Sequence, residues 1–316
     1  IMKNALQSFF LLSLFITSCS IQKSSDVELV LDTKSELGEG AIWNPKTNEL
    51  IWVDIEGKIL NFYNPELHNN KEMFTGQRIG TVVPAESGQV IVALENGLYA
   101  LDPETGTKKR IADPEQDKPD NRFNDGKCDP AGRLWAGTMS KNDEREAGAL
   151  YRLNADSSVQ KMIDKVSISN GIIWSNDNRF MYYIDTPTRQ VARYNYNNES
   201  GEISNPEVVV EVPEEMGAPD GMTIDSEGNL WIALWGGSAV GCWNPENGKL
   251  LKKIEVPAKN VTSCAFGDTD LGTLYITTAR IGTSKEELKK FPQAGGLFKS
   301  VPGVKGVEAS FFRDEF

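Results

Sequence analysis

A repeat of about 45 residues runs through most of this chain and constrains its fold more than any other feature. Short runs of β-branched, aliphatic and aromatic residues recur, each preceded by a turn rich in Asn, Asp, Gly or Pro, without sustained helical periodicity. Such short strands are typical of an all-β sandwich, barrel or propeller. The six runs are spaced by 40, 44, 47, 49 and 44 residues and begin at Leu50, Val90, Leu134, Met181, Leu230 and Leu274.

A spacing of about 45 residues matches one four-stranded propeller blade, which decides among these three architectures. The six copies fill nearly all of residues 27–307, so one closed ring is favoured over two domains. We therefore predict an all-β chain with a six-bladed β-propeller over residues 27–316. Residues 27–33 are expected to pair with the last blade, which closes the ring and removes its free edges.

The first residues carry a pattern typical of an exported lipoprotein. Lys3 supplies a positive charge, residues 9–16 form an apolar run too short to span a bilayer, and Cys19 follows small residues at the end of that run. We predict a lipoprotein-type signal peptide over 1–18, a lipid anchor at Cys19 and a polar tether over 19–26. The expected location is the bacterial cell envelope, lipid-anchored at a periplasmic or outer surface. The alternative is a plain secretory signal with a chance Cys.

Charge and histidine content exclude several classes of function. The chain has 33 Lys and Arg against 45 Asp and Glu, a net charge of −12. This balance argues against a nucleic-acid or anionic-membrane surface, since both attract clustered Lys and Arg. His68 is the one histidine, so zinc sites built on two or three His are excluded and a Ser-His-Asp triad would have to use His68. Hydrolytic chemistry would therefore use carboxylates, amides, Lys or Arg, or a metal with oxygen ligands.

Four oxygen-bearing residues occupy the same phase of their repeats. Each lies 10 or 11 residues before the run of the first, third, fourth or fifth repeat, and they are Glu39, Asn124, Asn170 and Asp220. The second and sixth repeats offer the weaker Gly80 and Ser263. The first strand of each propeller blade lines the central channel, so these side chains are expected to meet at one end of it. Two carboxylates without a Lys or Arg at equivalent positions would repel each other unless a cation lies between them. Their oxygens suit Ca²⁺, Mg²⁺ or Mn²⁺, and Zn²⁺ where carboxylates dominate. The alternative is a polar, water-filled channel that holds the blades together.

Arg122 precedes Asn124 by two residues, so both side chains point to one side of the same strand. An arginine at a channel mouth can hydrogen-bond sugar hydroxyls or a carboxylate. The alternative is an ion pair with Asp120 or Asp125.

The remaining motifs and residue types are expected to have structural rather than chemical roles. Residues 268–272 resemble a calcium loop but lack its bidentate Glu, so we expect a turn. Residues 284–291 are predicted as a short exposed helix with a Ser284–Glu287 capping box. The aromatic residues of the strands are expected in the blade cores, and His68 in an exposed turn. Buried free thiols are expected at Cys128, Cys242 and Cys264, although a Cys242–Cys264 disulfide stays open.

Four motifs together resemble one family. Residues 38–43 read Gly-Glu-Gly-Ala-Ile-Trp, residues 122–127 Arg-Phe-Asn-Asp-Gly-Lys, residues 169–172 Ser-Asn-Gly-Ile and residues 219–224 Pro-Asp-Gly-Met-Thr-Ile. In this order they resemble the senescence-marker-protein, gluconolactonase and regucalcin family, whose members are six-bladed, metal-dependent sugar lactonases.

The resemblance implies functional residues. Glu39, Asn170 and Asp220 would bind one divalent cation, with Ca²⁺ first and Mg²⁺, Mn²⁺ or Zn²⁺ as alternatives. Arg122 and Asn124 would contact the substrate. Asn142 occupies the place where the regucalcin branch has a substrate-binding Glu, and Asn supplies no carboxylate.

The expected activity is hydrolysis of a gluconolactone-like aldonolactone to the aldonic acid. The metal would polarise the carbonyl or the water, and Asp220 would serve as ligand and general base. The expected partner is a small sugar lactone, with no nucleic acid, membrane contact only through the lipid, and a monomeric chain. The alternatives are a non-catalytic glycan- or protein-binding propeller with a structural cation, and a related hydrolase that acts on phosphoesters or organophosphates.

Overall fold

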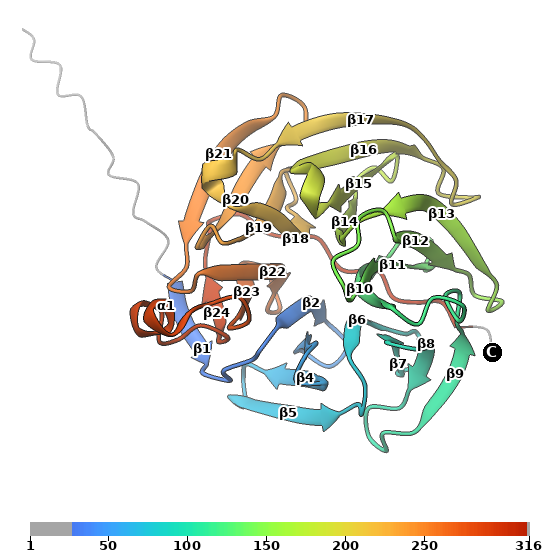
Figure 1. Ribbon diagram of the computed structural model, residues 1–316, viewed down its shortest axis with the longest axis horizontal. Coiled ribbons are helices and arrows are strands. Elements are labelled where there is room, and N and C mark those ends of the chain that lie inside the picture. Colours follow the sequence, from blue (N-terminus) through green and yellow to red (C-terminus); the bar gives the residue numbers. More distant parts are fainter. Residues whose placement is uncertain (1–26, 315–316) are drawn as a thin grey trace, which may run out of the picture.

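The computed structural model describes residues 27–314, which form a ring of six four-stranded antiparallel sheets (Figure 1). In five of the sheets, four consecutive strands lie side by side as an up-and-down meander, and in the sixth sheet three consecutive strands are joined by β1. The chain is almost entirely β-structure in these residues. The six-bladed β-propeller predicted from the repeat is thereby confirmed.

The strands follow the predicted repeat. Blades one to three consist of β2 (Gly38–Asn44), β3 (Glu49–Asp54), β4 (Ile59–Asn64) and β5 (Asn69–Phe74); β6 (Ile79–Pro84), β7 (Val90–Leu94), β8 (Gly97–Leu101) and β9 (Lys108–Ala112); and β10 (Asn121–Cys128), β11 (Leu134–Ser140), β12 (Gly148–Leu153) and β13 (Val159–Val166). Blades four and five consist of β14 (Ser169–Trp174), β15 (Phe180–Asp185), β16 (Gln190–Tyr196) and β17 (Ile203–Glu211); and β18 (Ala218–Ile224), β19 (Leu230–Trp235), β20 (Ala239–Asn244) and β21 (Lys249–Glu255).

Blade six closes the ring with strands from both ends of the chain. It consists of β22 (Asn260–Gly267), β23 (Thr273–Ala279), β24 (Leu297–Ser300) and β1 (Val27–Leu31). β1 pairs antiparallel with β24, with Val27 opposite Ser300 and Leu29 opposite Phe298. The expected pairing of residues 27–33 with the last blade is confirmed.

Aromatic side chains fill the spaces between neighbouring blades, as the strand pattern predicted. The rings of Trp43 in blade one and Tyr275 in blade six are parallel, with centroids 6.1 Å apart. Trp135 in blade three meets Trp174 in blade four edge to face at 5.8 Å. Each buried aromatic side chain removes about 150–250 Å² of surface from water, so these contacts hold adjacent blades together.

The same turn recurs before the second strands of blades three and five. Asp129 Oδ1 accepts hydrogen bonds from the backbone N–H groups of Ala131 and Arg133, while its Oδ2 accepts one from the Trp135 indole. Asp225 makes the equivalent bonds to backbone N–H groups two and four residues later and to the Trp231 indole. An Asp at this point therefore shapes the turn and orients the core tryptophan six residues on.

The C-terminal residues 301–314, called here the C-terminal strap, run across the ring at the end where the second strands begin (Figure 1). The backbone N–H of Ser226 in blade five donates to Lys305 O, and that of Phe312 donates to Pro84 O in blade two. The Phe312 side chain is fully buried in the core of blades two and three. The strap thus ties distant blades together.

Smaller predictions are also confirmed. Helix α1 (Lys285–Lys290) begins after Ser284, whose side chain and Glu287 form a capping box. Asp268 belongs to a turn, where it accepts hydrogen bonds from the side chains of Thr273 and Tyr275. His68 lies exposed in its turn with a positive φ of 50°. Cys128, Cys242 and Cys264 are buried and unpaired, as expected for apolar free thiols.

The signal peptide over 1–18, the tether and the lipidated Cys19 lie outside the described residues. Between residues 27 and 314, no helix combines the length and the apolar character that crossing a bilayer requires.

Candidate functional site

The predicted side chains meet at the end of the channel where the first strand of each blade begins. Glu39 lies on β2, Asn124 on β10, Asn170 on β14 and Asp220 on β18, and each is 4–6% exposed. In all four strands the pairing register with the second strand shifts at or just after the residue concerned. Such β-bulges bend a strand and re-aim a side chain. Here they accompany four side chains that lie close to the ring axis.

Side-chain amides connect three of the blades by hydrogen bonds. Arg122 donates from Nη1 to Asn124 Oδ1 at 2.7 Å, which confirms that both side chains point the same way. Asn124 Nδ2 donates to Asn170 Oδ1 at 3.1 Å, and Asn170 Nδ2 donates to Thr186 Oγ1 at 2.8 Å. Thr186 Oγ1 in turn donates to Pro219 O at 2.8 Å, directly before Asp220. This chain fixes the orientation of both amides, with the Asn170 oxygen turned toward Asn124.

The two carboxyl groups lie against each other without a basic partner. Burial, then the nearby Asp125, raises the pKa of Glu39 to about 8, although Glu39 Oε2 accepts a hydrogen bond from Gly40 N at 3.0 Å. Burial and the charge of Glu39 raise the pKa of Asp220 well above its ordinary range. Asp220 Oδ1 is buried and has no hydrogen-bond partner among the described residues. An orphaned carboxylate oxygen is costly.

These residues fit a divalent cation. Two acidic oxygens and an amide oxygen are the hard donors that Ca²⁺, Mg²⁺ and Mn²⁺ prefer, and a cation would satisfy Asp220 Oδ1 and offset the repulsion with Glu39. In residues 27–314 no three or more His, Cys, Asp or Glu side chains are grouped so as to hold a metal. A cation at Glu39, Asn170 and Asp220 would therefore depend on the amide and on water to complete its shell.

Arg122 is a buried cation beside this site. Its side chain is 8% exposed, and Nη1 donates to Phe123 O and to Asn124 Oδ1. Burial lowers the pKa of Arg122. In the described part of the chain no carboxylate lies within 4 Å of its guanidinium, so the alternative ion pairs with Asp120 and Asp125 do not form. Its remaining N–H groups are available to a ligand.

Asn142 lies apart from this cluster. It follows β11 in an exposed loop, where its backbone N–H donates to Ser140 Oγ at 3.1 Å. No contact joins its side chain to the clustered residues within 27–314. Its substrate-binding role stays a prediction, as do the ligand and catalytic roles of the other site residues.

The sequence pattern did not reveal the role of Thr186 or the steric requirement for glycine at position 80. Thr186 follows β15, far from the repeat phase used to find the other residues, and nothing in its local sequence marks its bond to Asn170. A Cβ on Gly80 would lie 2.5 Å from the backbone C and O of Phe123. Blade two therefore contributes no side chain at this phase, because the backbone of blade three occupies that space.

Comparison with known proteins identifies the family. The model of the SMP-30/gluconolactonase/LRE-like family matches residues 37–280, most of the ring. The chain belongs to this family.

Relatives in the family match over nearly their whole length. A Bacillus subtilis (strain 168) protein with the provisional name sugar lactone lactonase YvrE is 43% identical over 275 residues, 87% of this chain and 94% of its own. Danio rerio regucalcin is 40% identical over 287 residues, 90% of this chain and 97% of its own. The crystal structure of regucalcin from Agrobacterium tumefaciens strain C58, described as a calcium-binding protein, has a TM-score of 0.88 and 29% identity. It covers 92% of this chain and 98% of that one.

Proposed function

We propose that this protein hydrolyses a sugar lactone of the aldonolactone type to its acid, with a divalent cation bound by Glu39, Asn170 and Asp220. The observation that carries the proposal is the buried, unpartnered Asp220 Oδ1 beside Glu39. On the neighbouring blades, Asn124 is hydrogen-bonded to both Arg122 and Asn170. Relatives named lactonase and regucalcin support the same reaction and the same class of ion. When bound, the cation supplies Lewis acidity and neutralises the two carboxylates.

In this proposal Asp220 is the general base. One oxygen of its carboxylate would bind the cation, and the other would accept a proton from the attacking water. The water oxygen forms a bond to the lactone carbonyl carbon, and the ring C–O bond then breaks. The proton held at Asp220 passes to the departing alkoxide oxygen, so no covalent enzyme intermediate is needed.

Arg122 and Asn124 orient the substrate in this proposal. The Arg122 guanidinium keeps N–H groups unused by the protein, and a planar fork of donors suits sugar oxygens. Asn124 is held by Arg122 on its oxygen and by Asn170 and Ser169 O on its nitrogen. Its amide therefore has a fixed position before any ligand arrives, which reduces the entropy lost on binding.

The test is acid release from a panel of aldonolactones after chelation and reloading with Ca²⁺, Mg²⁺, Mn²⁺ or Zn²⁺ in turn. We expect ion-dependent release from at least one lactone, and loss of release and of ion binding in Asp220→Asn. Asp270→Asn, at an exposed carboxylate near the strap, serves as the matched control with unchanged turnover. Ion binding without acid release from any lactone would favour the non-catalytic binder, and release from a chromogenic phosphoester alone would favour the phosphoester hydrolase.

We also propose that Cys19 carries a lipid that holds the propeller at the bacterial cell envelope. The support is the order of the basic residue, apolar run and Cys in the sequence. Labelling cells with a radioactive fatty acid should mark the protein, and Cys19→Ala should abolish the label. Persistent label in that variant would exclude the anchor.

A further inference from the structure

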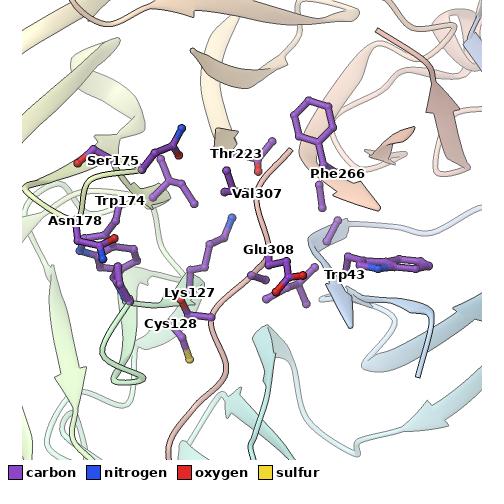
Figure 2. A pocket seen from close by; sticks show the side chains of 18 residues that line it. Trp43, Lys127, Cys128, Trp174, Ser175, Asn178, Thr223, Phe266, Val307 and Glu308 are labelled. Carbon is purple, nitrogen blue, oxygen red and sulfur yellow. The ribbon is translucent and has the colours of Figure 1, made fainter. Parts of the chain in front are cut away.

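A cavity of about 240 Å³ opens at the strap end of the channel, away from Glu39 and Asp220 (Figure 2). On β2, Ala41, Ile42 and Trp43 line it, whereas Glu39 lies two to four residues earlier, about 7–13 Å away at 3.3 Å per residue. Neither Glu39 nor Asp220 lines the cavity. The strap residues Val307 and Glu308 form one wall. The cavity is therefore a different place from the candidate lactone site.

A constriction separates the two ends of the channel. Between them lies a space of about 10 Å³ whose walls include Asp125 and Lys127. This volume holds about one water molecule. Neither Glu39 nor Asp220 lines the strap-end cavity, so a ligand bound there does not occupy the proposed lactone site.

Lys127 is the cationic group of this cavity. Figure 2 shows its side chain extending into the cavity toward Thr223 and Val307. Its Nζ donates to Met222 O at 2.9 Å. Within residues 27–314 no carboxylate lies within 4 Å of Nζ, and no second hydrogen bond is formed. An ammonium has three N–H donors, so two stay without an acceptor in the protein.

Two carboxyl groups face Lys127 at longer range. Asp125 lies behind it, toward the constriction, and its attraction favours the charged amine, while burial disfavours that form and lowers the pKa of Lys127. Glu308 is exposed on the strap at the cavity mouth. Water screens Glu308 far more than it screens a group inside the cavity. Apart from Lys127 and Glu308, the described residues that line the cavity are uncharged.

The remaining walls combine apolar surface with hydroxyl and amide groups. Ile42, Ile173, Ala265 and Phe266 supply apolar surface. Pockets for drug-sized ligands usually measure about 300–1,000 Å³, so this cavity suits a smaller molecule. Apolar walls around one amine with two unused N–H donors favour a small apolar ligand that carries a carboxylate.

We propose that this cavity is a second ligand site, which binds a small monocarboxylate with a flat apolar body through the Lys127 ammonium. The carboxylate accepts hydrogen bonds from the two unused N–H groups of Lys127, and the apolar body lies against Ile42, Ile173 and Phe266. The strap completes the site, since Val307 closes one side of it.

The experiment titrates the full chain with benzoate and with benzamide, its neutral counterpart of nearly equal shape. Melting temperature and tryptophan fluorescence report binding, because Trp43 and Trp174 line the cavity. We expect benzoate to bind at least ten times more tightly than benzamide. We expect Lys127→Met, which keeps the side-chain length, and Val307→Phe, which fills the cavity and leaves Lys127 in place, to lose benzoate binding. Lys285→Met, at an exposed lysine of α1, should bind as the unaltered chain does.

A second readout needs no variant. Acetic anhydride labelling of the unaltered protein, followed by peptide mass mapping, gives the acetylation rates of Lys127 and Lys285. Saturating benzoate should slow acetylation of Lys127 at least fivefold and leave Lys285 unchanged. Equal affinity for benzamide and benzoate, unchanged acetylation of Lys127, or undiminished benzoate binding in Val307→Phe would each overturn the proposal.

Discussion

Replacing Glu39 by Gln should stabilise the metal-free protein and make it insensitive to divalent cations. The folded pKa of Glu39 is about 8, above its ordinary value of 4.5, so the folded state binds its proton more tightly than the unfolded state. Stability contributed by the protonated group is therefore complete below about pH 4.5 and falls as pH rises to about 8. At 1.36 kcal/mol per pKa unit, the loss at pH 7 is about 3 kcal/mol.

Glu39→Gln keeps the shape of the protonated acid and cannot ionise. In a chelator at pH 7 its free energy of unfolding should exceed that of the unaltered chain by about 3 kcal/mol, or ~6 °C in melting temperature at about 2 °C per kcal/mol for a chain of this size. Excess divalent ion should reverse the order, since an ion at 1,000 times its Kd stabilises the unaltered protein by about 4.1 kcal/mol. This gain exceeds the difference of about 3 kcal/mol, and the variant lacks one ligand.

Asp54→Asn is the matched control for a buried carboxylate. Asp54 accepts hydrogen bonds from the backbone N–H groups of Glu36, Leu37 and Gly57. The NH₂ group of the asparagine would face backbone N–H groups and could not accept their hydrogen bonds. We therefore expect the free energy of unfolding to fall by about 1–3 kcal/mol with or without metal. Thermal unfolding in chelator and in excess ion, from pH 5 to 9, measures all three proteins. A Glu39→Gln protein that is less stable than the unaltered chain in chelator, or that gains equally from the ion, would refute this account of the site.

Three further substitutions test the geometry. Arg122→Ala should raise KM for the lactone about 10- to 100-fold with kcat little changed, because charge-assisted hydrogen bonds contribute about 1.5–3 kcal/mol. Steady-state kinetics measures both constants, and a fall in kcat alone would contradict a binding role. Thr186→Val removes the hydroxyl that links Asn170 to Pro219 O, so the affinity for the divalent ion, measured by calorimetry, should fall at least tenfold. Unchanged affinity would show that Asn170 does not need this hydrogen bond. Phe312→Ala should lower the free energy of unfolding in urea by about 3–5 kcal/mol, since the ring is fully buried; a loss below about 1 kcal/mol would mean that the strap is not part of the cooperative unit.

The local parts of the fold were predictable because their causes lie within one repeat. Turn residues at fixed offsets and alternating apolar residues mark each strand, and the interval between copies gives the blade size. Glu39 and Asp220 could be found by phase alone, because equal positions in successive blades of a ring converge on its axis. The capped helix after Ser284 follows from a signal only four residues long.

The sequence by itself determined the six-bladed ring, its closure by the first strand and the set of polar residues at one end of the channel. Only the tertiary structure decided which of their oxygens stay free, that Thr186 supports Asn170, and that the strap and Lys127 enclose a cavity at the opposite end. The physical reason is distance along the chain. Turn and strand preferences act over a few residues, whereas the partners of a buried amide or amine come from blades tens to hundreds of residues away, and only packing brings them together.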